Sequence, residues 1–238
     1  MVQAAPCPRL LLVDDNRDNL ALLRLFLANA QYRLDEAVNG DEAVALFSAH
    51  SYDLVVMDLE MPVVDGYEAT RRIRALEWQR HSPPVPILAL TAHALDEHRL
   101  RCQEAGFTDF LVKPVRKTTM LRTLLSFLGN GQPTETASRP EREAVDPGRL
   151  TALLPFFYET SRQSLDEARQ ALSRGDLETV RRLGHRLKGS AGSYGFGELG
   201  QAGAALEQAG ETVAAGAALD WAAALLAKAR LDWPAGGE

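Results

Sequence analysis

Residues 9–16 read R-L-L-L-V-D-D-N, an aliphatic run that ends directly at two adjacent aspartates. Short apolar runs of this kind recur through the first half of the chain, at residues 10–13, 54–57, 87–90 and 110–112, with a more polar run at 32–37. Such runs, bounded by polar residues, glycine or proline, are typical of buried strands, and the polar run is typical of an edge strand.

Stretches with the apolar spacing of helices alternate with these runs, at residues 19–30, 41–49, 67–77, 96–105 and 118–128. Parallel strands need such crossover helices, which pack on the faces of the sheet. The first half therefore predicts an α/β domain with a five-stranded parallel sheet and helices on both faces.

The second half lacks the strand pattern. Residues 129–145 are rich in Gly, Pro, Ser, Thr and charge, which predicts a flexible linker. Four or five amphipathic helices then follow, with breaks at Gly175, around 195–197 and around 210–216. We therefore predict a first domain over residues 1–128, the linker, and an all-α four-helix bundle over 146–238.

Composition excludes several classes of protein. Of the 238 residues, 46% are hydrophobic and 24% are charged, so a wholly disordered chain is excluded. The net charge of -6 argues against a nucleic-acid binder. Cys7 and Cys102 show no C-x-x-C spacing, which suits a reducing cytoplasm. We find no secretory signal and expect a cytoplasmic protein without membrane insertion.

Polar and charged residues stand at the end of each central strand. Asp14 and Asp15 follow the first strand, Asp58 follows the third, Thr91 ends the fourth, and Lys113 lies at the end of the fifth. Two aspartates after a strand are by themselves more often a helix cap or a turn. All five positions, however, lie along the carboxyl edge of one parallel sheet, which is where ligands bind.

That cluster of carboxylates has a chemical consequence. Three neighbouring carboxylates repel one another and raise one another's pKa, and a hard divalent cation such as Mg²⁺ (or Mn²⁺) relieves the repulsion. A metal-charged site beside a remaining carboxylate oxygen suits phosphoryl transfer to that oxygen. The cluster therefore predicts a magnesium-dependent phosphoryl acceptor.

Four stretches carry a resemblance to the response-regulator receiver domain, over about residues 9–128. They are L-L-V-D-D-N at 11–16, V-M-D-L-E-M-P-V-V-D-G at 56–66, A-L-T-A at 89–92 and F-L-V-K-P at 110–114. The resemblance implies a flavodoxin-like fold in which Asp58 is the phosphoacceptor. It also implies that Asp15 and Asp58 hold the metal with the backbone carbonyl of Glu60, and that Asp14 acts through water.

The same resemblance implies roles for the remaining residues at this edge. Thr91 would contact the phosphoryl group, and Phe110 would rearrange with it. Lys113 would pair with the phosphate and precede a cis peptide bond to Pro114. Glu60 and His93 stand at positions that vary within the family, so they either influence the lifetime of the phosphoaspartate or are solvated loop residues.

One histidine in the second half has an unusual context. Residues 185–196 read H-R-L-K-G-S-A-G-S-Y-G-F, so His185, Lys188 and Gly189 share one face of a helix. Gly189 costs about 1 kcal/mol relative to Ala and removes bulk where a partner could approach. Lys188 could stabilise negative charge, and a neutral imidazole can accept a phosphoryl group on one nitrogen.

This stretch resembles the histidine-containing phosphotransfer (Hpt) domain, whose core is H-x-x-K-G-S, over about residues 146–233. The resemblance implies that His185 carries a phosphoryl group with support from Lys188 and Gly189. It also places Glu207 where a Gln or Glu bonds the ring nitrogen that is not phosphorylated. Residues 195–200 match G-x-G-x-x-G, but no strand precedes them, so we interpret them as an interhelical turn.

We find no Walker A sequence, kinase glycine loop or ATP lid, so we do not expect a stand-alone ATP-dependent kinase. We expect a phosphorelay protein that promotes its own Asp phosphorylation, dephosphorylation and His–Asp transfer. Its partners would be an upstream histidine or hybrid kinase and a downstream response-regulator receiver, and the tether permits transfer between Asp58 and His185. Two alternatives stay open: receiver phosphorylation gates access to the Hpt domain, or the chain is a phosphate sink.

Overall fold

The computed structural model describes residues 7–28, 30–91, 96–128 and 147–231, without the side chains of 96–98, 147–152 and 231. The chain divides into two compact units, Met1–Val145 and Asp146–Glu238, and each is described by itself. The predicted linker, residues 129–145, lies outside the described residues.

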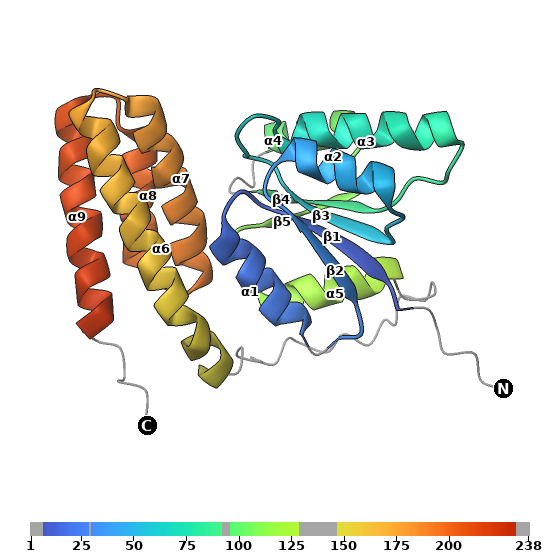
Figure 1. The fold of residues 1–238 in the computed structure, drawn as a ribbon, viewed down its shortest axis with the longest axis horizontal. Helices are drawn as coiled ribbons and strands as arrows, with labels where there is room; N and C mark the ends of the chain where they lie inside the picture. The colour runs from blue at the N-terminus through green and yellow to red at the C-terminus, as the bar shows by residue number, and fades with distance from the viewer. Residues whose placement is uncertain (1–6, 29, 92–95, 129–146, 232–238) are drawn as a thin grey trace. The chain divides into compact units, whose positions relative to one another are not determined.

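The first unit is the predicted parallel α/β domain (Figure 1). Its five strands in the described residues pair in the order β2-β1-β3-β4-β5, and every pairing is parallel. The elements are β1 (Arg9–Val13), α1 (Arg17–Leu27), β2 (Arg33–Ala37), α2 (Gly40–Ala49), β3 (Leu54–Asp58), α3 (Gly66–Arg80), β4 (Ile87–Thr91), α4 (Asp96–Ala105), β5 (Asp109–Val112) and α5 (Lys117–Leu128). The polar strand β2 lies at the edge, as its sequence predicts.

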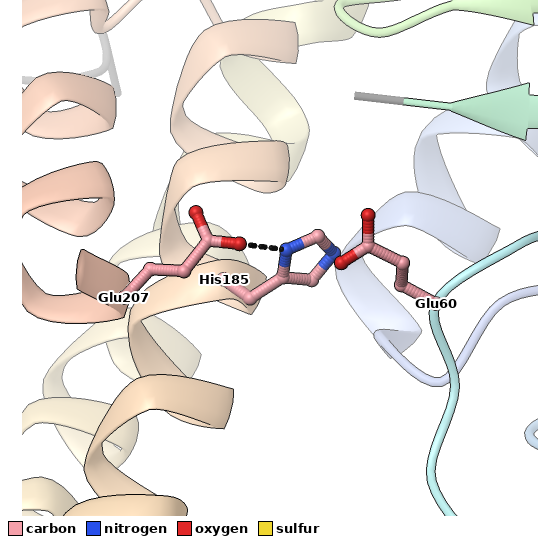
Figure 2. A group of neighbouring side chains, drawn as sticks. All are labelled: Glu60, His185 and Glu207. Carbon is pink, nitrogen blue, oxygen red and sulfur yellow. Dashed lines mark hydrogen bonds and ion pairs between the residues drawn. The ribbon is translucent and has the colours of Figure 1, made fainter. Parts of the chain in front are cut away.

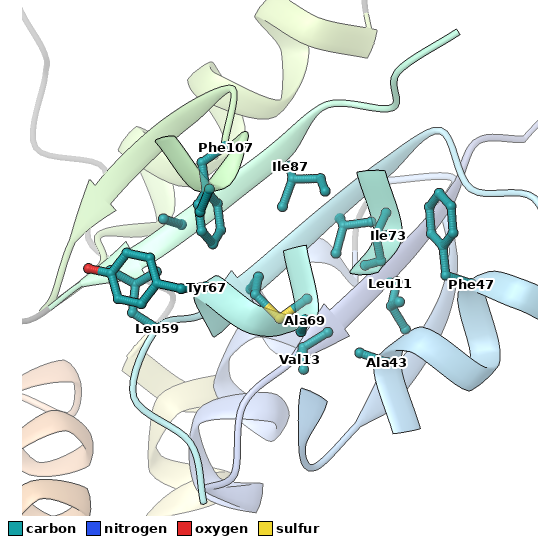
Figure 3. Packing of buried hydrophobic residues seen from close by; sticks show 14 of the residues in the cluster. Leu11, Val13, Ala43, Phe47, Leu59, Tyr67, Ala69, Ile73, Ile87 and Phe107 are labelled. Atoms are coloured by element: carbon teal, nitrogen blue, oxygen red, sulfur yellow. The ribbon is translucent and has the colours of Figure 1, made fainter. Parts of the chain in front are cut away.

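Both faces of the sheet are buried, because helices cover each of them: α1 and α5 cover one face, and α2, α3 and α4 cover the other (Figure 1). Successive residues of a strand point to opposite faces. Leu11 and Val13 therefore pack with Ala43 and Ile73 under α2 and α3 (Figure 3). Leu10 and Leu12, which are also fully buried, point to the opposite face. Two buried faces account for the almost entirely apolar sequences of β1, β3 and β4.

Sheet register brings the strand ends level with one another. Val13 pairs with Met57, and Asp58 pairs with Leu90, so the residues just beyond β1 and at the end of β3 and β4 are neighbours. The backbone N–H of Lys113 continues the pattern past β5 by donating to the carbonyl of Thr91 over 2.7 Å. Residues far apart in the sequence thus meet at one edge.

Capping residues begin the helices at this edge. Asn16 accepts a hydrogen bond from the backbone N–H of Asp18 and starts α1, while Asp65 accepts from the N–H of Glu68 and starts α3. Each cap satisfies a backbone donor that would otherwise have no partner inside the helix. Helix α1 can therefore begin after only three intervening residues from the end of β1, close to the acidic cluster.

The second unit contains only helices in the part of the chain that the structure describes: α6 (Pro147–Ser173), α7 (Leu177–Ser193), α8 (Gly197–Gln208) and α9 (Thr212–Leu231). Helix α6 packs against α7 and α9, and α8 packs against α7 and α9, which makes the predicted four-helix bundle (Figure 1). Gly175 and Gly195 form turns with positive φ angles of 75° and 87°. Phe157 stacks on Tyr194 and Phe196 near the second turn. The G-x-G-x-x-G match thus lies at an interhelical turn, as interpreted from the sequence.

Helix α9 has a feature that the sequence analysis did not anticipate. Within the described residues, its segment Thr212–Arg230 is long and apolar enough to cross a membrane by length and composition. The same helix buries Ala215, Leu219, Ala222 and Leu226, and it packs against α6 and α8. Packing in the bundle accounts for these four residues, and 28% of the apolar segment is buried in all.

Candidate functional sites

Three aspartates come together at the carboxyl edge of the sheet. Carboxylate oxygens of Asp14, Asp15 and Asp58 lie within 4.8 Å of one another. Asp14 and Asp58 are buried, with 0% and 3% exposure, whereas Asp15 is partly exposed. Charges at these distances interact strongly because little water separates them.

Asp14 is held by two asparagines that the sequence analysis did not assign to the site. The backbone N–H of Asn16 donates to Oδ1 over 2.9 Å, and the side-chain amide of Asn19 reaches both oxygens at 3.0 Å. Asn19 lies in the first turn of α1, five residues after Asp14. That spacing from the strand end into the helix is the signal that could have identified it.

Lys113 provides the cation of the cluster. Its Nζ lies 2.9 Å from Oδ2 of Asp58 and 3.1 Å from Oδ2 of Asp14, and its side chain is 8% exposed. Burial alone would lower the pKa of this lysine, but the two carboxylates outweigh burial and raise it. The lysine therefore carries its positive charge at neutral pH.

The pKa of Asp58 shows that clustering three carboxylates is unfavourable for the charged form. Burial raises the pKa of its carboxyl, Asp14 and Asp15 raise it further, and Lys113 opposes them, with a net pKa of about 7. One ammonium group thus balances three carboxylates incompletely. An additional divalent cation with oxygen ligands would offset the excess negative charge, so the donor set fits Mg²⁺.

Other predicted residues lie where the topology requires. Thr91 is the last residue of β4 and is buried, at 4% exposure. Phe110 lies in β5 and packs against the core, and the Lys113–Pro114 peptide bond is cis. Glu60 lies in the loop between β3 and α3, whereas His93 lies outside the described residues.

The loop after Asp58 depends on one glycine. A Cβ atom at Gly66 would stand 2.2 Å from the carbonyl oxygen of Asp58, a distance that side chains do not reach. The backbone N–H of Gly66 instead donates to the carbonyl of Leu59 over 3.0 Å. Close return of the loop therefore requires glycine at this position. Val63, in the same loop, has a φ of 72° and is 87% exposed.

A second polar cluster lies within the bundle. Nδ1 of His185 on α7 lies 2.8 Å from Oε1 of Glu207 on α8 (Figure 2). Nζ of Lys188 donates to the other carboxylate oxygen of Glu207 over 2.9 Å. All three side chains are partly exposed, so His185 is not sealed in an apolar interior. Gly189 follows Lys188 in α7 and is also partly exposed.

The ionisation of Glu207 assigns the proton on the histidine. Burial would raise the pKa of Glu207, but the hydrogen bonds from His185 and Lys188 outweigh it and lower the pKa to about 2. An ionised carboxylate can only accept hydrogen bonds. Nδ1 of His185 therefore carries the shared proton, and in the neutral ring Nε2 keeps a lone pair.

Two family models match the two units. The response regulator receiver domain matches residues 10–125, and the Hpt domain matches residues 152–232. The chain is 32% identical over 214 residues to a sensor histidine kinase, GacS, of Pseudomonas protegens, a match covering 81% of this chain and 23% of that protein. It is 30% identical over 205 residues to the virulence sensor protein BvgS of Bordetella pertussis, covering 77% and 17%.

Solved structures match the first unit. A co-crystal structure of the Saccharomyces cerevisiae histidine phosphotransfer protein Ypd1 with the receiver domain of its downstream response regulator Ssk1 aligns with a TM-score of 0.50 and 32% identity, over 52% of this chain and 91% of that one. A receiver domain of a Pseudomonas aeruginosa sensor histidine kinase, with magnesium in its active-site cleft, aligns with a TM-score of 0.47 and 40% identity, over 52% and 99%.

Residues 10–125 thus belong to the response-regulator receiver family and residues 152–232 to the Hpt family. The chain thus joins a receiver domain to an Hpt domain. It spans 23% or less of the two sensor proteins that it resembles.

Proposed function

We propose that Asp58 accepts a phosphoryl group from a phosphohistidine and that His185 exchanges a phosphoryl group with a receiver aspartate. The observation that carries this proposal is the pairing of a buried carboxylate with Lys113 in one unit and of an imidazole with Glu207 in the other. Each unit thereby presents one nucleophile with a charged neighbour. A buried ion pair of this kind is a frequent feature of functional sites.

The acidic cluster fits a magnesium ion, and Mn²⁺ has the same ligand preference for oxygen. Asp15, Asp58 and the backbone carbonyl of Glu60 would hold the metal, with Asp14 acting through water. A bound metal ion would neutralise negative charge on the phosphoryl oxygens. Asn16 and Asn19 hold Asp14 in place through hydrogen bonds to its carboxylate.

In the first step, a carboxylate oxygen of Asp58 attacks the phosphorus of the donor phosphohistidine. The new P–O bond forms as the P–N bond breaks, and the departing imidazole nitrogen keeps the electron pair, so the positively charged phosphorylated ring leaves as a neutral imidazole. Lys113 and the hydroxyl of Thr91 stabilise the oxygens of the transferred group. Lys113 is already placed for this because its Nζ contacts Asp58.

In the second step, Nε2 of His185 attacks the phosphorus of a phosphoaspartate. The P–N bond forms, the P–O bond breaks, and the aspartate leaves as a carboxylate. The ring gains positive charge, which the carboxylate of Glu207 stabilises through the Nδ1 proton. Transfer in the opposite direction uses the same contacts, because the chemistry is reversible.

Partners follow from these two steps. Asp58 needs a phosphohistidine donor, which an upstream histidine or hybrid kinase supplies, and His185 needs a receiver aspartate on a response regulator. The solved complex of a histidine phosphotransfer protein with a receiver domain supports that pairing. We propose a cytoplasmic location, which agrees with the free thiols of Cys7 and Cys102. The net charge of -6 supports partners other than nucleic acid.

Labelling with a small acyl phosphate tests the receiver step. Wild type should gain one hydroxylamine-sensitive phosphoryl group, only with Mg²⁺, and Asp58→Asn should gain none. Asp53→Asn is the matched control. Asp53 is an exposed aspartate directly before the first residue of β3, whereas Asp58 is the last residue of that strand. Equal labelling of Asp58→Asn and wild type would refute Asp58 as the acceptor.

The two alternatives make distinct predictions. Gating requires that transfer to or from His185 changes when Asp58 is phosphorylated, so equal rates would exclude it. A phosphate sink requires fast loss of the phosphoryl group from Asp58, so a phosphoaspartate half-life of hours would exclude that role.

A further inference from the structure

Gly184 on α7 and Gly203 on α8 lie where the two helices pack closely against each other. A Cβ atom at Gly184 would stand 2.6 Å from the backbone nitrogen of Glu207 and 2.8 Å from the carbonyl oxygen of Gly203. A Cβ atom at Gly203 would stand 2.5 Å from the backbone nitrogen of Lys188 and 2.9 Å from the carbonyl oxygen of Gly184. Cβ atoms essentially never come closer than 3.0 Å to other heavy atoms. Each glycine thus faces the other helix at a distance that no side chain allows.

These obstacles are mainly backbone atoms, which cannot rotate aside as the end of a side chain can. An added methyl group would therefore push the two helices apart locally. Interiors are close-packed, so a displacement of this kind spreads to the neighbouring contacts.

The same two helices carry the polar cluster. Gly184 directly precedes His185, and Gly203 lies one turn before Glu207. The hydrogen bonds from His185 and Lys188 to Glu207, of 2.8 and 2.9 Å, both cross from α7 to α8 beside the two glycines. N–H···O hydrogen bonds in proteins have donor–acceptor distances of about 2.7–3.2 Å, so these two bonds tolerate only a few tenths of an ångström of added separation.

We propose that Gly184 and Gly203 are positioning residues, which hold α7 and α8 at the separation that lets Glu207 bond Nδ1 of His185. Glu207 then keeps the proton on Nδ1 and leaves Nε2 as the nucleophile. The effect on phosphotransfer rests on the proposed function of His185, whereas the effect on the hydrogen bond does not.

A purely structural role for the glycines makes a different prediction. It would lower the stability of the bundle without changing the protonation of the His185 ring in the folded protein. The low pKa of Glu207, about 2, depends on its hydrogen bonds from His185 and Lys188, so it also reports on the separation of the helices.

The test compares Gly203→Ala with Gly200→Ala in the full chain. Gly200 lies on the same helix, and a Cβ there would stand no closer than 3.5 Å to any neighbour, which is ordinary contact. Nitrogen-15 shifts of the His185 ring report which nitrogen carries the proton, and carbon-13 shifts of Glu207 report its pKa. Circular dichroism confirms that each variant is folded.

We expect Gly203→Ala to lose the preference for the Nδ1 proton and to raise the pKa of Glu207 toward its usual value of 4.5. Phosphotransfer to His185 should fall by roughly a hundredfold, because a misplacement of about 1 Å can have that effect. Gly200→Ala should match wild type in all three measurements. In a Glu207→Ala background, Gly203→Ala should add no further loss of transfer.

Gly184→Ala, on the facing helix, is the second variant and should reproduce the result. An unchanged tautomer and Glu207 pKa in both folded variants would overturn the proposal. Unfolding of both would also overturn it, because the glycines would then be needed for folding rather than for spacing. If wild type showed the Nδ1 proton but His185 accepted no phosphoryl group, the proposed function would fail and the positioning role would stand.

Discussion

Nζ of Lys113 lies 2.9 Å from Oδ2 of Asp58, and both side chains are almost completely buried. This ion pair joins the ends of β3 and β5 at the acidic edge of the sheet. It also leaves the cluster with more negative than positive charge, because Asp14 shares the same ammonium group. The pair therefore places a cation beside the proposed nucleophile without neutralising the site.

Removing that cation should impair Asp58 in two ways. In Lys113→Met the pKa of Asp58 should rise above its present value of about 7, because Lys113 lowers it. The ammonium contact to the phosphoryl oxygens is lost as well, so we expect phosphorylation at pH 7 to slow by roughly a hundredfold or more. A pH profile of acyl-phosphate labelling measures both effects. Lys228→Met, at an exposed lysine of α9, should leave the profile unchanged.

The raised pKa of Asp58 also predicts how stability depends on pH. Because the folded-state pKa, about 7, exceeds the usual 3.8, this group favours folding most below pH 4, and that contribution is lost as the pH rises toward 7. At pH 8 the ionised, buried carboxylate of Asp58 destabilises the fold. Asp58→Asn removes that charge, so the variant should be more stable than wild type by roughly 1–3 kcal/mol at pH 8. Calorimetry of the receiver transition without divalent cations should show a smaller gain at pH 5. A gain that grows as the pH falls would contradict the assigned shift.

Two substitutions of Glu207 separate its role as a hydrogen-bond acceptor for His185 from the role of its negative charge. Glu207→Gln keeps an oxygen that accepts from Nδ1 of His185 but loses the negative charge that stabilises the phosphorylated ring, so transfer to His185 should fall, but by less than in Glu207→Ala. Glu207→Ala removes the acceptor, and transfer should fall by roughly a hundredfold. Rapid-quench labelling measures both rates. Equal losses in the two variants would show that the charge, and not the acceptor, is what matters.

The lowered pKa of Glu207 makes stability depend on pH in the opposite sense from the raised pKa of Asp58. A carboxyl with a folded-state pKa of about 2 stabilises the fold above pH 4.5, and that stabilisation is lost as the pH falls toward 2. The stability difference between wild type and Glu207→Gln should therefore be largest near pH 7 and shrink in acid.

The positive φ angle of Val63 predicts that a substitution at this position stabilises the protein. This β-branched residue has a φ of 72°, a conformation that glycine and asparagine adopt much more readily. Because its side chain is 87% exposed, replacing it removes little packing. Val63→Asn should raise the free energy of unfolding by about 1 kcal/mol in urea titrations. Val213→Asn, at an 83% exposed valine in helix α9, should give no such gain.

Much of the receiver could be predicted because its pattern is local. Apolar runs such as residues 54–57 identify strands, and parallel topology then places every strand end at one edge. Asp14, Asp58 and Lys113 follow from that rule alone, without knowledge of any side-chain contact. The polar run at 32–37 identified the edge strand, because the pattern of polar and apolar residues is also local.

What could not be predicted depends on contacts between elements. Asn19 reaches Asp14 from the first turn of α1, and its role depends on where that helix starts relative to the strand. The hydrogen bond from Nζ of Lys188 to Glu207 was not predicted, and the role of Lys188 in supporting a phosphoryl group stays a prediction. That hydrogen bond, like the contact of Gly184 with Gly203, depends on how α7 crosses α8, which helical spacing alone does not specify.

We propose further that Asp58 of the same chain can serve as the receiver aspartate that supplies His185, and this is tested most directly by following label from one donor in three chains. With an acyl phosphate and Mg²⁺, wild type should acquire hydroxylamine-sensitive phosphate on Asp58 first and acid-labile phosphate on His185 afterwards. His185→Gln should retain only the label on Asp58, and Asp58→Asn should acquire neither. Full acid-labile labelling of His185 in Asp58→Asn would contradict transfer from Asp58 to His185.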